Sequence, residues 1–436
     1  MSQGSEGARR SHRYPTWVVV AISVFLTVLA TLLVVNFLPG EKKIERQLER
    51  LYGTSDPQFR RSLSVLLGPP LVDGNRFETL RNGDEIFPAM LTAIGAAKTS
   101  ITFETYIYWS GDIGKKFVDA LAERASKGVK VHVLLDWLGS SKMDAELLDK
   151  MKKSGVQVER YHEPRWYNLG RMNNRDHRKM LVVDGRMGFT GGVGIADKWT
   201  GHGQDPEHWR DTHFRAEGPV VAQMQAVFMD NWTKSTGKVL HGGAYFPSLA
   251  PVGDAAAQTF ASSPGGGSES MHLMYLLAIT AAEHTIHLSS SYFVPEELTS
   301  RALVDALKRG VKVQIITPGT DIDTEVVRKA SRARWGELLQ AGAEISEYQP
   351  TMFHCKVMVV DGRLVSVGST NFDNRSFRLN DEANLNVVDP AFAARQVEIF
   401  QQDLAQSRRI TYEAWLDRPF TEKVLEHAAS IFGAQL

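Results

Sequence analysis

The chain has a single cysteine, Cys355, among its 436 residues. One cysteine excludes an internal disulfide and a metal site built from several cysteines. The chain also lacks an excess of either charge, because 50 lysine and arginine residues balance 50 aspartate and glutamate residues. A protein that grips nucleic acid over a broad surface neutralises many phosphates. The charge balance therefore argues against a nucleic-acid partner, although it leaves room for one local phosphate pocket.

The chain has one long run without a charged residue, over residues 15–40. About 20 apolar residues suffice to cross a bilayer as a helix. A signal peptide has a shorter apolar core of about 7–15 residues, and a core helix usually keeps a polar stripe. We therefore expect an uncleaved transmembrane anchor over residues 15–39.

Basic residues lie on both sides of this predicted anchor. Those before it are Arg9, Arg10 and Arg13, and those after it are Lys42, Lys43, Arg46 and Arg50. Under the positive-inside rule, the first group favours a cytoplasmic N-terminus with the rest of the chain on the periplasmic side, and the second group opposes this orientation.

Beyond the anchor, four segments of the first half recur in the second half in the same order. The matched pairs are residues 93–109 with 278–294, 127–136 with 309–318, 154–164 with 341–350, and 177–192 with 354–369. Four matches in one order indicate an internal duplication.

Each half alternates helical and strand patterns. Residues 117–127 have helical periodicity and are followed by an apolar, β-branched strand over residues 129–135. The second half repeats this at residues 301–309 and 311–316, and a further helix is expected over residues 324–340. The alternation predicts two α/β sandwich lobes, each with helices on both faces of a mixed sheet.

These patterns predict six parts of the chain. They are a basic N-terminal tail (1–14), the transmembrane anchor (15–39), a juxtamembrane stalk (40–72), a first lobe (73–234), a linker (235–257) and a second lobe (258–436). The linker is predicted from its turn-rich composition.

A histidine and a lysine stand two residues apart at the start of one matched strand in each half. Residues two apart in a strand share a face, so His177 and Lys179 point together, as do His354 and Lys356. The residue between them points to the other face and changes from arginine to cysteine between the halves. Because the shared face is kept while the other face drifts, we expect these side chains to meet an anionic group.

These residues resemble the paired motif of the phospholipase D superfamily. The two copies are His177-x-Lys179-x4-Asp184 and His354-x-Lys356-x4-Asp361, and Gly-Ser-Thr-Asn at residues 368–371 is similar to the element that follows the motif. With the segments NNRDHRK, WRDTHFRAEGP and SSYFVPEE, the chain resembles bacterial cardiolipin synthases from about residue 73 to its C-terminus. The resemblance implies that both motifs meet at the interface of the lobes in one active site, without a metal or another cofactor.

The resemblance also implies a role for each motif side chain. His177 would attack the phosphorus and carry a phosphatidyl group, while His354 would protonate the departing alcohol and deprotonate the incoming one. The opposite assignment stays open, because two near-equivalent imidazoles titrate as a pair. Lys179 and Lys356 would hold the phosphoryl oxygens, a fixed electrostatic role that could replace a metal ion.

Four acidic residues belong to this predicted site. Asp211 and Glu382 occupy matching positions in the strand after each motif, and the resemblance implies that each orients the histidine of its own lobe. Asp184 and Asp361 complete the catalytic motifs by resemblance, although the glycine after each favours a role in the turn.

The Gly-Ser-Thr-Asn element supplies the predicted phosphate ligands Ser369 and Asn371. The first half departs from this pattern, because Gly194 stands where the second half has Asn371. One amide that could face phosphate is therefore missing from the first lobe.

By resemblance, we expect a membrane-anchored phosphatidyltransferase that makes cardiolipin from two phosphatidylglycerol molecules and releases glycerol. The implied partners are phosphatidylglycerol, other anionic phospholipids and a membrane, the bacterial inner membrane by resemblance; no oligomeric state is indicated. The motif sets the reaction class rather than the acceptor, so a phospholipase D that uses water or a nuclease are alternatives. A non-catalytic membrane scaffold is a third alternative, although neither histidine nor lysine has been lost.

Overall fold

The computed structural model describes residues 15–37, 44–163, 173–264 and 269–431. The described residues fall into two units, one that contains residues 15–37 and one that contains residues 44–163, 174–264 and 269–431. The predicted basic tail, Lys42, Lys43 and the last two residues of the predicted anchor lie outside the described residues.

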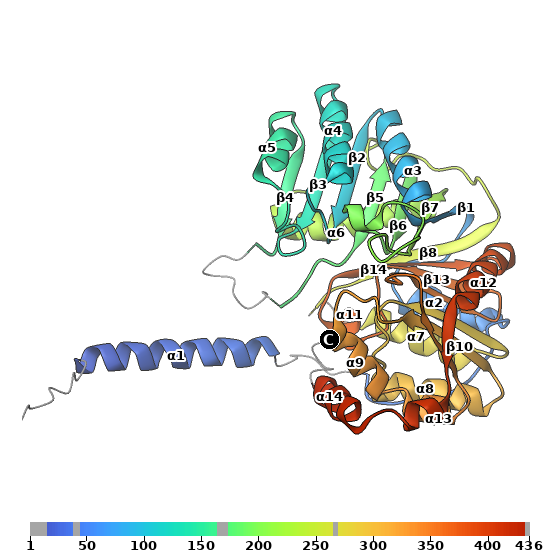
Figure 1. Cartoon of the computed structure of the whole chain (residues 1–436). Helices are drawn as coiled ribbons and strands as arrows, with labels where there is room; N and C mark the ends of the chain where they lie inside the picture. Colours follow the sequence, from blue (N-terminus) through green and yellow to red (C-terminus); the bar gives the residue numbers. More distant parts are fainter. Residues whose placement is uncertain (1–14, 38–43, 164–172, 265–268, 432–436) are drawn as a thin grey trace, which may run out of the picture. The chain divides into compact units, whose positions relative to one another are not determined.

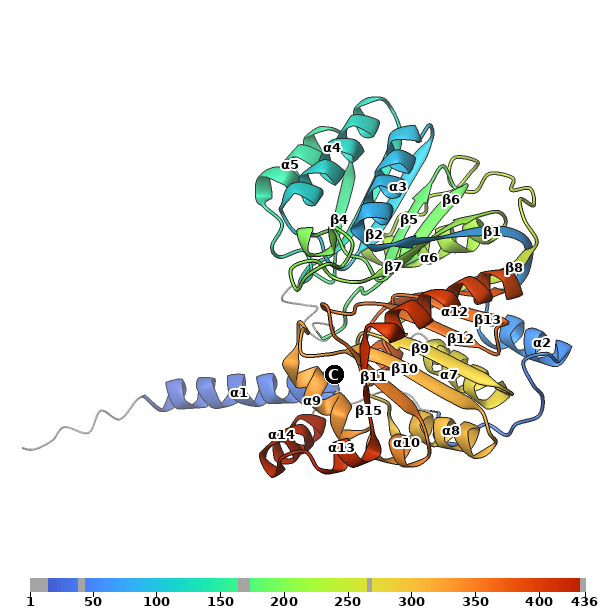
Figure 2. The same ribbon diagram turned by 45° about the vertical axis from the view of Figure 1, so that its right-hand side comes forward.

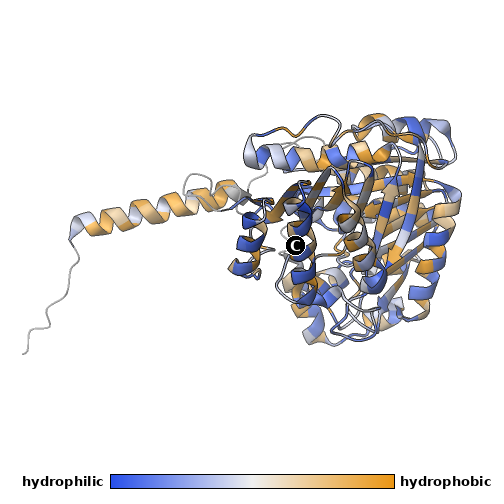
Figure 3. Ribbon diagram, turned by 90° about the horizontal axis from the view of Figure 1, so that it is seen from above, coloured by the Kyte–Doolittle hydropathy of each residue, from blue (hydrophilic) through white to orange (hydrophobic). Residues whose placement is uncertain are grey.

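Helix α1 (Thr16–Phe37) coincides with the predicted anchor. It is the one helix within the described residues that is long and apolar enough to cross a membrane, and the ribbon in Figure 3 has the colour of hydrophobic residues along most of this helix. The hydroxyl groups of Thr27 and Thr31 donate to backbone carbonyls one turn earlier, each at 2.8 Å. The hydroxyls of Thr27 and Thr31 therefore need no hydrogen-bond partner from outside the helix.

The larger unit is built on one continuous sheet. Its order within the described residues is β15-β11-β10-β9-β12-β13-β14-β8-β1-β7-β6-β5-β2-β3-β4. The first-lobe elements are β1 (Val72–Arg81), α3 (Asn82–Ala96), β2 (Ser100–Thr105), α4 (Asp112–Ser126), β3 (Lys130–Asp136), α5 (Ala145–Lys153), β4 (Gln157–Tyr161), β5 (Lys179–Val183), β6 (Met187–Gly191), the 3-10 helix η2 (Asp197–Trp199), β7 (Thr212–Glu217) and α6 (Val220–Thr236).

The second lobe follows the same plan. Its elements are β8 (Ala255–Ser262), α7 (Ser270–Ala281), β9 (Thr285–Ser290), α8 (Glu297–Lys308), β10 (Lys312–Pro318), α9 (Glu325–Ala333), α10 (Gly336–Gln340), β11 (Glu344–Tyr348), β12 (Lys356–Val360), β13 (Leu364–Gly368), α11 (Asn374–Arg378), β14 (Glu382–Val388), α12 (Pro390–Ala405), β15 (Ser407–Ile410), α13 (Tyr412–Leu416) and α14 (Phe420–Ile431). In each lobe three neighbouring strands run parallel and the others antiparallel, which confirms the predicted pair of α/β lobes with mixed sheets.

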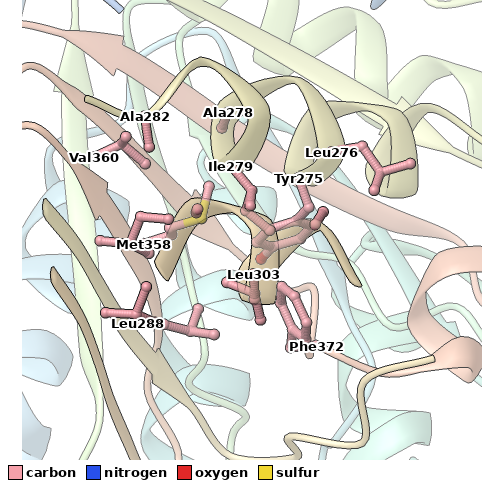
Figure 4. Close-up of a cluster of buried hydrophobic side chains, with 14 of the residues drawn as sticks. Tyr275, Leu276, Ala278, Ile279, Ala282, Leu288, Leu303, Met358, Val360 and Phe372 are labelled. Atoms are coloured by element: carbon pink, nitrogen blue, oxygen red, sulfur yellow. The ribbon is translucent and has the colours of Figure 1, made fainter. Parts of the chain in front are cut away.

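Helices cover both faces of each half of the sheet. In the first lobe, α3, α4 and α5 lie along one face, as Figures 1 and 2 show, and α6 packs on the other. In the second lobe, α7 and α8 cover one face and α12 packs on the other. Figure 4 shows Tyr275 and Ile279 of α7 directed toward Leu288 and Met358 of the sheet.

A separate apolar core joins the lobes. It includes Met180 and Val182 of β5, and Val359 and Val365 of the second lobe. These side chains alternate with those that face the predicted site, because a strand presents successive residues to opposite faces. The lobes are therefore packed together through the face of the motif strands that is opposite the predicted site.

Three expected elements differ in detail. The helix predicted over residues 324–340 is two helices, α9 and α10, and a side chain at Gly336 would overlap the ring of Trp415. Strand β8 begins at Ala255, inside the predicted linker. The predicted stalk contains α2 (Pro57–Leu66). The apolar residues of the stalk pack against the core of the second lobe, which was not predicted from the sequence. Those residues are Ile44, Leu48, Tyr52, Phe59, Leu63 and Leu67.

Candidate active site

The start of each motif strand is bonded to the opposite lobe. The backbone N–H of His177 donates to the carbonyl of Asp381 at 2.9 Å, and the N–H of His354 donates to the carbonyl of Arg210 at 2.8 Å. Asp381 and Arg210 are the residues directly before the two predicted orienting acids. Each motif is therefore clamped to the segment that leads into the acid of the other lobe.

The acids consequently bind the histidines across the lobes. Nδ1 of His177 lies 3.0 Å from Oε1 of Glu382, and Nδ1 of His354 lies 2.8 Å from Oδ2 of Asp211. The expectation that each acid serves the histidine of its own lobe is wrong. The reason is the pair of backbone hydrogen bonds to Asp381 and Arg210, because the acid that follows each of these residues then reaches the imidazole of the other lobe.

The acceptors fix the tautomer of both imidazoles. A carboxylate accepts from Nδ1–H, so the neutral rings of His177 and His354 carry their proton on Nδ1 and keep a lone pair on Nε2. Burial lowers the pKa of His177 to about 4 and that of His354 to about 3. Burial by itself would raise the pKa values of Asp211 and Glu382, but the adjacent imidazoles hold both below their usual range. Both histidines are thus neutral before substrate binds, and Nε2 of each ring carries no proton.

The lysines lie beside the same groups. Nζ of Lys356 lies 2.5 Å from Oγ of Ser291 and 3.3 Å from both ring nitrogens of His354. Nζ of Lys179 donates to the carbonyl of His177 at 2.7 Å. Burial lowers the pKa of Lys179 to about 7 and also lowers the pKa of Lys356.

Charge links the two motifs directly. Burial is the main cause of the low pKa values of both histidines. In addition, the positive charge of Lys356 lowers the pKa of His177, and that of Lys179 lowers the pKa of His354. Each lysine therefore acts on the imidazole of the opposite lobe as well as its own. The four side chains form one electrostatic cluster that is suited to an anion.

Glu382 receives further hydrogen bonds from the second lobe. The hydroxyl of Ser376 donates at 2.7 Å, the amide of Asn380 at 3.3 Å, and the hydroxyl of Ser369 also donates to it. Ser369 was expected to bind phosphate, but its hydroxyl contacts the acid and is fully buried. Ser376 and Asn380 were missed, because no pattern in the sequence connects α11 with the acid.

Asn371 lies beside the second lysine. Its Oδ1 accepts from the hydroxyl of Ser291 at 2.9 Å, and Ser291 also contacts Lys356. In the first lobe, a Cβ at Gly194 would lie 2.6 Å from Cβ of Ile107. The first lobe therefore has no room for the amide that the family pattern places there.

The motif aspartates lie at the far ends of the strands. Asp184 follows β5, where its carboxylate accepts from the backbone N–H groups of residues 98–100 at 2.7–3.1 Å. Asp361 follows β12 and accepts from those of residues 283–285 at 2.7–2.9 Å. Both have positive φ, 53° and 52°. The structure thus shows both carboxylates holding turns, and their catalytic role stays a prediction.

Aromatic rings surround the two imidazoles. The ring of Tyr106 lies 5.2 Å from that of His177, and the rings of Trp199 and Trp209 lie 5.2 Å and 5.7 Å from that of His354. Within the described ranges, no group of three or more histidine, cysteine, aspartate or glutamate residues is arranged to hold a metal ion. The chemistry that the arrangement supports is nucleophilic displacement at an anionic centre by an imidazole.

A family model described as "Cardiolipin synthase, PLD-like domain" matches residues 90–232 and 275–404, which contain both motifs and both orienting acids. The chain belongs to the cardiolipin synthase family of phospholipase D-like proteins. Cardiolipin synthase A of Pseudomonas entomophila is 35% identical over 354 residues, 81% of this chain and 73% of that protein. The major cardiolipin synthase of Bacillus subtilis is 33% identical over 362 residues, 82% of this chain and 75% of that protein.

The fold of this cardiolipin synthase family member is also found in solved structures. The crystal structure of phosphatidylserine synthase from Haemophilus influenzae matches with a TM-score of 0.68 at 13% identity, over 87% of this chain and all of that chain. Polyphosphate kinase from Porphyromonas gingivalis matches with a TM-score of 0.53 at 12% identity, over 86% of this chain and 53% of that chain. At these identities, the matches establish the shared fold alone.

Proposed function

We propose that this chain is a membrane-anchored phosphatidyltransferase that makes cardiolipin from two phosphatidylglycerol molecules, with release of glycerol, through a covalent phosphatidyl-histidine. The crossed pairs His177–Glu382 and His354–Asp211 are the observation that supports this most strongly. They leave two Nε2 atoms, one from each lobe, beside two buried lysines.

The first step is displacement of glycerol. Nε2 of His177 attacks the phosphorus of phosphatidylglycerol, so that an N–P bond forms as the P–O bond to glycerol breaks. His354 donates a proton to the departing oxygen. The free imidazole of His354 is neutral, and the negative charge of the bound phosphodiester favours its protonated form, because an opposite charge stabilises an imidazolium.

The second step transfers the phosphatidyl group. A primary hydroxyl of a second phosphatidylglycerol gives its proton to Nε2 of His354 and attacks the same phosphorus. The N–P bond to His177 breaks and the new P–O bond completes cardiolipin. Both histidines return to their starting protonation states, as repeated turnover requires.

Fixed positive charge supports both steps. Lys179 and Lys356 stabilise the phosphoryl oxygens, whose negative charge increases in the transition state. Glu382 and Asp211 hold the rings and stabilise the imidazolium forms, as the acid does in a catalytic triad. Ser291 and Asn371 orient Lys356.

The lipid substrate is favoured over nucleic acid by the chain's zero formal charge and by α1. We propose that α1 anchors the chain in the bacterial inner membrane, with the catalytic lobes on the periplasmic side. Hydrolysis, with water as the acceptor, is the second candidate reaction, because water can replace the hydroxyl of the second lipid at the same site.

Lipid analysis of cells that lack cardiolipin tests the proposal. Expression of the full-length chain is expected to restore cardiolipin and to release glycerol, and His177→Ala and His354→Ala are expected to abolish both. Expression that yields only phosphatidic acid would establish the hydrolase instead. Wild-type levels of cardiolipin from either alanine variant would refute the assigned roles.

A further inference from the structure

The two orienting acids are held by different donors, and the first lobe uses a tryptophan. Nε1–H of Trp199 donates to Oδ2 of Asp211 at 3.0 Å. The same oxygen accepts Nδ1–H of His354 at 2.8 Å. In the second lobe, the hydroxyl of Ser369 donates to Glu382. An indole N–H thus serves in one lobe where a hydroxyl serves in the other.

The glycines of the first lobe explain the exchange. Gly192 matches Ser369 in the repeat, and a Cβ at Gly192 would overlap the carboxylate of Asp211. A Cβ at Gly194 would lie 3.2 Å from the ring of Trp199, in addition to its contact with Ile107. In the first lobe, Asp211 occupies the space of the first side chain of the Ser-x-Asn element, and Ile107 with the indole occupies that of the second.

Trp199 is held firmly enough to fix the direction of its N–H. Its side chain is 2% exposed and its ring packs edge-on against Trp209 at 4.6 Å. The carboxylate of Asp197, two residues earlier, accepts from two backbone N–H groups in the first turn of α4. A Cβ at Gly83 would overlap the backbone of Trp199 and Thr200, so the start of α3 packs directly against this segment.

We infer that Trp199 is a positioning residue of the active site, which holds Asp211 at the angle that His354 requires for proton transfer. The inference rests on the proposed function, because it assigns Trp199 a part in the proton transfers of His354. Trp199 acts through Asp211, and no contact with substrate is needed.

The hydrogen bond from Trp199 to Asp211 also affects how strongly the carboxylate of Asp211 attracts the proton of His354. A hydrogen bond to a carboxylate stabilises its charged form and weakens its attraction for other protons. The charged groups that face His354 are Asp211, Lys356 and Lys179. Without the indole donor, His354 is the remaining partner of Oδ2 of Asp211. The carboxylate then stabilises the protonated imidazole more strongly, so the pKa of His354 rises.

The test is Trp199→Phe in the full-length chain, assayed with phosphatidylglycerol in vesicles. The variant keeps an aromatic ring and removes the donor, so kcat is expected to fall roughly 10- to 100-fold, the size of a lost hydrogen bond to a charged group. KM is expected to stay within about twofold, and the limb of the pH profile that reports His354 is expected to move up by roughly half a unit. Trp335→Phe is the matched control, because it removes a buried indole N–H that donates to the hydroxyl of Ser331 in the core of the second lobe and touches no residue of the site.

A second substrate separates positioning from a structural role. An analogue with a nitrophenyl leaving group needs no general acid, so the first step of Trp199→Phe is expected to approach the wild-type rate. The tryptophan isostere benzothienylalanine at position 199 keeps the shape and lacks the N–H, and it carries the test if Trp199→Phe does not fold.

Equal loss with both substrates, or wild-type kcat and pH profile in the isostere, would overturn the inference. A wild-type chain that makes no cardiolipin would instead refute the proposed function, so the two failures are distinguishable.

Discussion

Replacement of Glu382 by glutamine tests the crossed pairing in the most detail. The carboxylate lies 3.0 Å from Nδ1 of His177 and receives three further side-chain donors, from Ser369, Ser376 and Asn380. An amide supplies one acceptor and brings an NH2 group among these donors, and it removes the charge that stabilises the imidazolium. At an effective dielectric constant of about 20, a unit charge at this distance contributes about 5 kcal/mol. We therefore expect kcat to fall by roughly 10³- to 10⁴-fold.

The assay compares two substrates in single turnover. Phosphatidylglycerol needs both a nucleophile and an acid, whereas an analogue with a nitrophenyl leaving group needs only the nucleophile. Glu382→Gln is expected to slow both substrates, because it impairs His177. Asp211→Asn is expected to slow phosphatidylglycerol far more than the analogue, because it impairs His354.

The grouping of the variants decides the question. Crossed pairing requires Glu382→Gln to behave like His177→Ala, and Asp211→Asn to behave like His354→Ala, whichever histidine is the nucleophile. If Asp211→Asn instead shared the profile of His177→Ala, each acid would serve its own lobe and our reasoning would be refuted.

Four further predictions follow from the same geometry. Lys356→Met is expected to lower kcat by about 10²- to 10³-fold in the vesicle assay, since it removes a fixed charge at the phosphoryl oxygens; a change below threefold would contradict this role. Asp184→Asn is expected to lower the free energy of unfolding by about 1–3 kcal/mol in urea titration while kcat stays within about twofold, because the residue holds a turn. Burial lowers the pKa of His177 to about 4 against 6.5 for an unperturbed histidine, so the unfolded chain binds more protons and stability should fall as the pH drops from about 6.5 toward 4; His177→Gln should reduce that slope in the same titration. Arg210→Met is expected to lower the free energy of unfolding by about 3–5 kcal/mol, because it leaves buried Asp403 without the partner that lies 2.8 Å away. The double variant Arg210→Met, Asp403→Leu should lose less stability, and an equal loss in both variants would count against the buried pair.

Much of the fold was predictable because it is local and repeated. The apolar, β-branched pattern of residues 129–135 placed β3 within a residue of its observed bounds. The duplication identified the histidines and lysines, since one face of a strand was kept while the other changed. The break between α9 and α10 was not predicted, and the ring of Trp415, which lies against Gly336 at the start of α10, is distant in the sequence.

The assignment of each acid to a histidine lay beyond sequence reasoning. Matching positions in a repeat identify Asp211 and Glu382 as a pair, but the repeat is silent on how the lobes dock. The backbone bonds of Asp381 and Arg210 to the opposite motifs decide the matter, and they form only in the assembled tertiary structure. The contact of the Ser369 hydroxyl with Glu382 was unpredictable for a similar reason, since it depends on where Glu382 lies.

The covalent intermediate provides the most direct measurement. Full-length protein is mixed with phosphatidylglycerol that carries a labelled phosphate, quenched within one turnover and digested for mass spectrometry. We predict an alkali-stable, acid-labile phosphatidyl group on His177 that disappears when unlabelled phosphatidylglycerol is added before the quench, as labelled cardiolipin forms. Label on neither His177 nor His354, while cardiolipin accumulates at the wild-type rate, would contradict the account.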